Sequence, residues 1–333
     1  MIDIVGGISM SHVPGALGWP DAPPADQQAR LAAIHTHLRE RLAAARPDLI
    51  VAFLDDHFEN HFRNLLPTLG VGIAPAHIGP AAYMMEALRF DRQHAIPSDA
   101  DLAEGLLREL VHAGFDAARM GAIEYGNNLM MPLHYIRPEF DIPVLPVFIN
   151  VFSPPLMPYG RAYDLGLATR RALEAIGGDR RILFLATGGL SHWPPVWTEG
   201  APEDDSFLQR MKTYQTEGKG VIADDPDLYT DLARYEMKMM DKMQWPLGYQ
   251  HPLVNAEFDE ELLARFAEGD VRYMREITYD EVEQRGGHGG HELLNWVALM
   301  GAMNGARADY TAYEPVTEWI TGMAYAAYDG QQG

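Results

Sequence analysis

Four short stretches of the chain place a histidine or a glutamate directly after an apolar run or a glycine-rich turn. His12 follows the first apolar run in SHVPG, and His57 follows the second one in LDDH. His192 ends the stretch ATGGLSH, and Glu292 lies in GGHGGHELLNW before an apolar segment. In open α/β sheets, ligands bind beyond the carboxyl ends of the strands, where side chains from separate turns meet. These four side chains are therefore the candidates for a functional site.

Two histidines and one carboxylate from separate elements make up the facial triad of non-haem iron(II) oxygenases. Three such ligands cover one face of an octahedral ion and leave the opposite face for substrate and O₂. The sequence contains no cysteine, so any metal must be held by His, Asp or Glu side chains. These residue types alone do not distinguish Fe(II) from Zn(II) or Mn(II).

The stretch LIVAFLDDHFENHF, residues 49–62, contains two histidines at helical spacing. His57 and His61 together could be a zinc ligand pair, which would suit a hydrolase. If other segments supply the remaining ligands, only one histidine of this stretch is needed, and His57 is the better ligand because it comes first after the apolar run. His61 is then either a neighbour of the metal ligands or a pocket residue. Asp55 or Asp56 is expected to accept the other ring N–H of His57.

The alternation of apolar runs and helical periodicity predicts an α/β fold. Short runs at residues 2–8, 49–54, 144–151 and 181–187 are typical of buried strands, and helical patterns cover 25–45, 99–113 and 161–176. This order indicates a mainly parallel or mixed central sheet flanked by helices. Further helices are predicted at 204–217, 227–243, 259–268 and 290–303. We expect a single catalytic domain over residues 1–333, with an inserted helical segment at about 196–250.

Composition and charge exclude several kinds of partner. The chain has 47 acidic and 26 basic residues and a formal net charge of −21, so its surface repels nucleic acid and anionic membranes. No apolar stretch approaches the roughly 18 residues that a membrane span needs. The N-terminus is typical of a first strand and not of a signal peptide. We therefore expect a cytoplasmic protein that binds neither nucleic acid nor membrane.

Taken together, the motifs SHVPG, LDDH, GGLSH and GGHGGHELLNW resemble those of the type III extradiol ring-cleavage dioxygenases, the family of the protocatechuate 4,5-dioxygenase β-subunit and gallate dioxygenase (the LigB-type family). The motifs occur in the family's order. The resemblance covers most of residues 1–198 and 251–305, and it includes PLHYIRPEFDIPVLPVFINVF and NAEFDEELLARF.

The resemblance implies a role for each candidate residue. His12, His57 and Glu292 would be the ligands of Fe(II). His192 would be the catalytic base that deprotonates the bound diol, a role that suits a side chain with a pKa near neutrality. The substrate would be an aromatic diol, protocatechuate- or gallate-like by default, and O₂ would open its ring to a semialdehyde-type product. We expect a homo-oligomer, and a small α-subunit partner stays open because some family members use one.

Two features depart from the family pattern. Family members carry an Asp-His-Gly-x-x-x-Pro motif whose histidine contacts substrate or oxygen, and that histidine falls at Asn127 here. An amide forms hydrogen bonds but does not carry a proton at neutral pH. Tyr125, Asn128 and His61 are the candidates for covering this role in the substrate pocket. The second feature is segment 196–250, which is predicted to pack over the pocket or to form a subunit contact.

The substrate stays open at this level. An acidic substituent would need a cationic partner, for which Arg119, Arg137 and Arg161 are available. Ring cleavage of an aminophenol or a dihydroxypyridine by the same iron chemistry is one alternative. A zinc-dependent hydrolase using His57 and His61 is another, and a non-enzymatic binding protein of the same superfold is a third. The aromatic stretch at 313–328 is expected to cover the site or an interface, or to serve as a packing segment.

Overall fold

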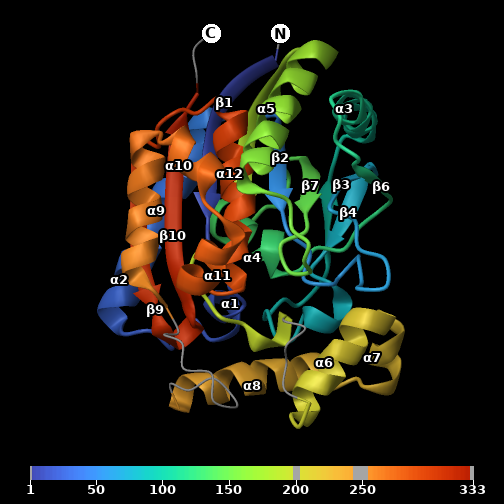
Figure 1. Cartoon of the computed structure of the whole chain (residues 1–333), viewed down its shortest axis with the longest axis vertical. Coiled ribbons are helices and arrows are strands. Elements are labelled where there is room, and N and C mark those ends of the chain that lie inside the picture. Colours follow the sequence, from blue (N-terminus) through green and yellow to red (C-terminus); the bar gives the residue numbers. More distant parts are fainter. Residues whose placement is uncertain (1, 198–202, 243–253, 331–333) are drawn as a thin grey trace.

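The computed structural model, which describes residues 2–197, 203–242 and 254–330, has a large mixed β-sheet at its centre (Figure 1). The strands of this sheet are β1 (Ile2–Met10), β2 (Leu49–Leu54), β3 (Leu69–Gly72), β6 (Ala118–Met120), β7 (Val144–Ile149), β8 (Arg180–Thr187), β9 (Tyr310–Val316) and β10 (Thr321–Asp329). Their order is β6-β3-β7-β2-β8-β1-β10-β9. A separate pair consists of β4 (Ala76–Gly79) and β5 (His94–Pro97).

The four central strands β7, β2, β8 and β1 run parallel to one another. Antiparallel pairs join β3 to β7 on one side and β10 to β1 on the other. β2 and β7 are buried along their whole length, as in a sheet that is covered on both faces. The expectation of an α/β fold with a mainly parallel or mixed sheet is confirmed.

Helices cover the sheet on both sides. α2 (Ala25–Ala45) packs against α4 (Asn127–Ile136) and β1, whereas α12 (Leu293–Ala302) packs against α5 (Tyr159–Ile176), β8 and β2. The other helices are α1 (Gly15–Gly18), α3 (Ala100–His112), α6 (Ser206–Glu217), α7 (Gly220–Asp224), α8 (Leu228–Lys242), α9 (Ala256–Glu268), α10 (Val271–Glu276) and α11 (Tyr279–Gly286). Among the described residues, no helix combines the length and apolarity that a membrane crossing requires.

The segment at 196–250 contributes α6, α7 and α8, which lie together at the end of the molecule opposite the two termini (Figure 1). Its residues 198–202 and 243–250 lie outside the described residues, as does the predicted helix end at Met243. Tyr229 and Leu232 of α8 line the same cavity as His12 and His57. α8 of this segment therefore contributes to the walls of that cavity.

The aromatic C-terminal stretch forms two strands that the sequence pattern does not reveal. β10 lies between β1 and β9 in the main sheet and is buried at every position but its last. A strand covered on both faces shows no alternation of polar and apolar residues, so its periodicity carries no signal. Between the two strands, a 3₁₀ turn at Thr317–Trp319 brings Trp319 to the cavity.

Candidate metal centre and active site

Three neighbouring parallel strands deliver three of the candidate side chains to one edge of the sheet. His12 follows the end of β1, His57 follows the end of β2, and His192 follows the end of β8. Because β2, β8 and β1 are adjacent and parallel, their carboxyl ends lie side by side. The position of each histidine after a strand is therefore what brings the three together.

Glu292 reaches the same place from the other end of the chain. It ends a 3₁₀ turn at Gly289–Glu292 that leads directly into α12, whereas the sequence pattern predicted a helix from residue 290. β8 ends close against it, since a methyl group on Gly188 would lie 2.6 Å from Glu292 Cβ. Gly188 also has a φ of +151°, which favours glycine. The backbone N–H of Gly189 donates to Glu292 Oε2.

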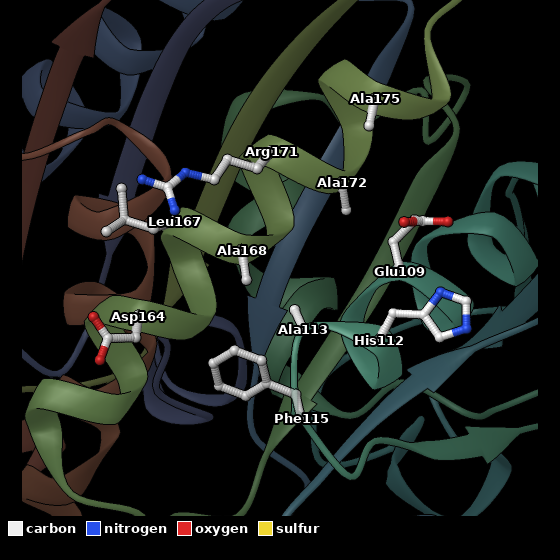
Figure 2. A pocket seen from close by; sticks show the side chains of 10 residues that line it. All are labelled: Glu109, His112, Ala113, Phe115, Asp164, Leu167, Ala168, Arg171, Ala172 and Ala175. Atoms are coloured by element: carbon white, nitrogen blue, oxygen red, sulfur yellow. The ribbon is translucent and has the colours of Figure 1, made fainter.

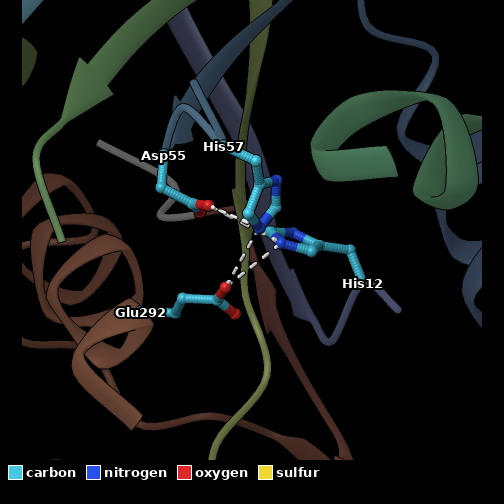
Figure 3. Close-up of side chains that lie close together, drawn as sticks. All are labelled: His12, Asp55, His57 and Glu292. Carbon is cyan, nitrogen blue, oxygen red and sulfur yellow. Dashed lines mark ion pairs between the residues drawn. The ribbon is translucent and has the colours of Figure 1, made fainter. Parts of the chain in front are cut away.

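The side chains of His12, Asp55, His57 and Glu292 form one buried cluster (Figure 3). Glu292 Oε1 lies 3.4 Å from Nε2 of both His12 and His57. The two imidazole rings stand edge to face, with centroids 5.1 Å apart. Their Nε2 atoms and the carboxylate oxygens thus converge on one point.

Asp55 belongs to this cluster in a way that corrects the sequence-based expectation. We expected Asp55 or Asp56 to accept the N–H of the His57 ring nitrogen that faces away from the metal. Instead, Asp55 Oδ2 lies 3.3 Å from His57 Nε2 and 3.7 Å from His12 Nε2, the nitrogens that face Glu292. Asp56 accepts backbone N–H groups of Asn60 and His61. Asn295 Nδ2 donates to Asp55 Oδ1 at 2.8 Å and orients its carboxylate.

The cluster has the properties of a cation site. His12 Nε2 and Asp55 Oδ2 are buried and have no hydrogen-bond partner in the described part of the chain, which a bound ion would explain. Burial alone would lower the pKa of His12, but Glu292 and Asp55 outweigh it and raise that pKa. Burial, together with Glu292, raises the pKa of Asp55 to about 6. The excess of negative charge favours a cation, and an imidazole and carboxylate set without thiolate suits Fe(II), Mn(II) or Zn(II).

His192 lies beside the cluster, with one ring nitrogen in a hydrogen bond to the backbone and the other available to accept a proton. Its Nδ1 lies 3.1 Å from Leu190 O and donates to it, so Nε2 is the atom that can accept a proton. That Nε2 lies 3.7 Å from Glu292 Oε1. Burial opposes a charge on His192, but Glu292 outweighs it and raises the pKa of the imidazole. His192 is therefore built to take up a proton at the edge of the cluster.

The turn that carries His192 is held by a buried aspartate of α9. Asp259 accepts from Ser191 N at 2.8 Å and from Ser191 Oγ at 2.7 Å, and Tyr313 OH also donates to it. The sequence offered a signal for this role, because Asp259 shares the apolar face of NAEFDEELLARF with Phe258 and Leu262. An acid on a buried helix face needs hydrogen-bond donors.

A second cluster, Glu283, His288 and His291, fastens the glycine-rich loop before Glu292. Glu283 Oε2 lies 3.1 Å from His288 Nδ1 and 2.9 Å from His291 Nε2. The other ring nitrogens are engaged too, by Phe152 O and by Tyr159 OH. Since every ring nitrogen already has a partner, this cluster anchors the loop and is not a second metal centre.

The metal cluster and His192 open into a cavity with mainly apolar walls. Its lining consists of His12, Val13, Pro14, His57, Met84, Asn127, His192, Pro194, Trp197, Tyr229, Leu232, Glu236, Glu292, Trp319, Ile320 and Thr321. A flat aromatic molecule suits such walls, because the aromatic side chains provide large contact areas. The structure therefore joins a cation site, a proton acceptor and an aromatic-lined cavity.

Of the four pocket candidates, the structure brings only Asn127 to the cavity. Asn127 begins α4, and its Nδ2 is buried without a hydrogen-bond partner among the described residues. The Oδ1 atom of Asn128 accepts hydrogen bonds from Gly126 N and Leu129 N, so this side chain stabilises the start of the helix. The fully buried Tyr125 packs edge to face against His77 and does not line the cavity.

His61 is also absent from the lining of the cavity and from the metal cluster. Asp56 holds its backbone N–H in the turn after His57, at 2.8 Å. Burial lowers the pKa of His61. Of the two histidines in LIVAFLDDHFENHF, His57 belongs to the cluster, whereas His61 is not among the residues that line the cavity.

The three arginines considered for an acidic substituent all lie elsewhere. Arg119 pairs with Glu104, Arg137 pairs with Asp141, and Arg161 donates to Gly114 O. A separate surface hollow lies between α3 and α5, where Glu109, His112, Asp164 and Arg171 face it (Figure 2). It shares no residue with the metal cluster or with its cavity.

The family model and the following relatives that match this chain are all described as dioxygenases. Residues 6–324 match the family model described as the catalytic LigB subunit of aromatic ring-opening dioxygenase. A Rhodococcus protein named 2,3-dihydroxyphenylpropionate/2,3-dihydroxicinnamic acid 1,2-dioxygenase is 31% identical over 321 residues, or 95% of each chain. Its namesake from Cupriavidus pinatubonensis is 30% identical over the same share of each chain. The Escherichia coli K12 protein of that name is 29% identical over 318 residues, which is 94% of this chain and 95% of the relative.

Proposed function

The chain belongs to the family of catalytic LigB subunits of aromatic ring-opening dioxygenases, and we propose that it is a non-haem Fe(II) enzyme that cleaves a catechol ring by the extradiol route. The observation that carries the proposal is the convergence of His12, His57 and Glu292 beside the free nitrogen of His192. The product would be a semialdehyde-type ring-opened compound. The similar proteins named for dihydroxyphenyl compounds support a diol as substrate.

His12, His57 and Glu292 would hold the iron, with Asp55 as a further donor at the same point. When bound, Fe(II) supplies neighbouring positions for the diol oxygens and O₂ and a path for electrons between them. Among the metals that this donor set suits, iron fits a reaction that consumes O₂. The protein's part is to orient the ring and to move protons.

His192 would remove a proton from one hydroxyl of the diol. Its Nδ1 is tied to Leu190 O, so Nε2 points the lone pair toward the cluster. Asn127 occupies the position at which the family pattern has a histidine. Its Nδ2 has no hydrogen-bond partner among the described residues, so it can donate to a substrate or oxygen atom, but an amide cannot transfer a proton. We infer that His192 handles the proton of the diol and that Asn127 positions the reactants.

The apolar wall would hold the ring and exclude water from it. Trp197, Tyr229 and Trp319 come from three different segments and surround the cavity. Ordered burial of the ring beside the metal cluster provides the proximity on which such a reaction depends. A single catalytic domain, with α6 to α8 as a cover for the cavity, fits this arrangement.

The proposal is tested by loading the protein with Fe(II) without oxygen and then measuring O₂ uptake with a panel of catechols, aminophenols and dihydroxypyridines. His192→Ala should keep iron and lose most turnover, because it removes a proton acceptor but no ligand. Glu292→Ala should lose iron. His57→Ala should also lose iron, whereas His61→Ala should keep it, which makes this pair a matched control. Absence of O₂ uptake with the whole panel, or the reverse pattern of iron content, would overturn the assignment.

A further inference from the structure

The walls of the cavity contain no Lys or Arg among the described residues. Residues 198–202 and 243–253, which the structure does not describe, include no Lys or Arg in their sequence. Lys242 is the one cationic residue whose side chain lies outside the described part of the chain. An anionic substituent on a substrate would thus find no cation in the described walls.

Arg63 lies behind one wall and is already engaged. Its guanidinium donates to Ser153 Oγ at 2.9 Å and to Trp197 O at 2.8 Å, and it stacks over the ring of Phe58. Gln215 Oε1 accepts from its Nε. With these donors committed, and because Arg63 is not among the lining residues, it is not available as a carboxylate partner.

The group that does face the cavity on the side of α8 is a carboxylate. Glu236 lies two turns after Tyr229 and one turn after Leu232, on the face of α8 that covers the cavity. It is partly buried, and no hydrogen bond or ion pair to another described residue holds its carboxylate. Burial raises the pKa of Glu236 to about 7, although His192 opposes the shift. A free acid at this position prefers a hydrogen-bond donor or a cation as its neighbour.

A bound Fe(II) would offset the negative charge of Glu292 and Asp55, so Glu236 is the uncompensated acid in the described walls of the cavity. A carboxylate on the substrate would be repelled by Glu236, because like charges in a partly buried site are unfavourable. A nitrogen substituent would instead donate to Glu236. The walls thus discriminate by the sign of the substituent charge.

We propose that Glu236 selects catechols whose ring substituent ends in an N–H donor, an amine or an amide, and rejects those whose substituent ends in a carboxylate. This inference rests on the proposed ring cleavage and names its substrate class. It separates this chain from the similar proteins, whose names refer to carboxylic acids. Glu236 is a specificity-determining residue on the wall of the cavity that α8 provides.

The test compares three catechols of matched size: 2,3-dihydroxyphenylpropionate, its primary amide, and the corresponding 3-aminopropyl catechol. For the Fe(II)-loaded protein at neutral pH, kcat/KM should be at least about tenfold higher for the amide and the amine than for the acid. Glu236→Gln should improve the acid by about tenfold and weaken the amine by a similar factor, because it removes the charge and keeps the shape. Anaerobic binding, followed by the intrinsic tryptophan fluorescence to which Trp197 and Trp319 of the cavity wall contribute, should show the same order.

Lys242→Ala is the control, since it removes the one cation whose side chain is not described. Its preference among the three compounds should equal that of the unaltered protein. A preference of the unaltered protein for the acid, or loss of acid binding in Lys242→Ala, would overturn the proposal. So would an unchanged preference in Glu236→Gln. If no compound supports O₂ uptake, the proposed ring cleavage fails, while the anaerobic binding order still decides the selectivity.

Discussion

A methyl group on Gly289 should slow turnover strongly and leave the metal centre intact. Built on Gly289, it would lie 2.2 Å from His192 Nε2 and 2.3 Å from His192 Cδ2. The obstacle is the end of a side chain and not backbone, so the loop can keep its place while the imidazole moves away. The Gly289→Ala variant therefore displaces the proton acceptor specifically.

The size of the effect follows from the distance. Restoring ordinary contact requires the ring to shift by roughly 1 Å, and a misplacement of that size in a catalytic group costs about 100-fold in rate. This corresponds to about 2.7 kcal/mol of transition-state stabilisation. Glu292 keeps its bond from Gly189 N and its place against β8, so iron content should not change.

Gly290→Ala is the matched control in the same turn. Its added methyl group would lie 3.3 Å from Val282 Cγ1 and 3.4 Å from Leu190 O, contacts that small movements relieve. The assays are O₂ uptake with the best diol of the panel, iron content after reconstitution, and thermal unfolding. Equal turnover in the two variants would refute the placement of His192 Nε2 as the working atom, and loss of iron in Gly289→Ala alone would show that the loop itself had moved.

Two further predictions concern stability. Glu283→Ala removes the partner of His288 and His291, so it should lower the free energy of unfolding by about 1–2 kcal/mol in urea titrations. Glu281→Ala, on the same helix, breaks a partly exposed pair with Arg285 and should cost no more than about 0.5 kcal/mol, and equal losses would contradict the anchoring role of Glu283. Burial lowers the pKa of His35 to about 3, so the unfolded chain binds a proton that the folded chain excludes, and stability is lost as the pH falls from 6.5 toward 3. Between pH 6.5 and 5 this loss is about 2 kcal/mol. In the His35→Phe variant, the free energy of unfolding should therefore depend less steeply on pH over that range. Equal slopes in the two proteins would show that the imidazole is not buried.

The sequence was informative where function follows local order. His12, His57 and His192 each come after an apolar run that is recognisable as a strand, and parallel neighbours share an edge. Their convergence was therefore predictable from pattern. Glu292 follows a glycine-rich turn and not a strand, so the pattern marked it as a candidate, and the resemblance then implied its role as a ligand beside His12 and His57.

Other parts of the site depend on contacts between distant segments. The orientation of Asp55 is determined by Asn295, which lies 240 positions further along the chain. Glu236 sits in a helix rich in Met, Lys and Asp and has the sequence context of a surface residue. β10 has no alternation because both of its faces are covered. In each case the deciding partner is remote, and no local pattern encodes it.

The pairing of β1 with β10 affects the order in which the strands of the main sheet can pair during synthesis. Ser11 Oγ donates to Gly322 O, a contact between residues 311 positions apart, and Ser11 N donates to Ala324 O. On this edge β1 has no partner until ribosomal synthesis has passed residue 324, although its other edge can pair with β8 once residue 187 has been made. The cluster of His12, Asp55, His57 and Glu292 can therefore assemble only after residue 292 has been synthesised, when most strands of the main sheet already exist.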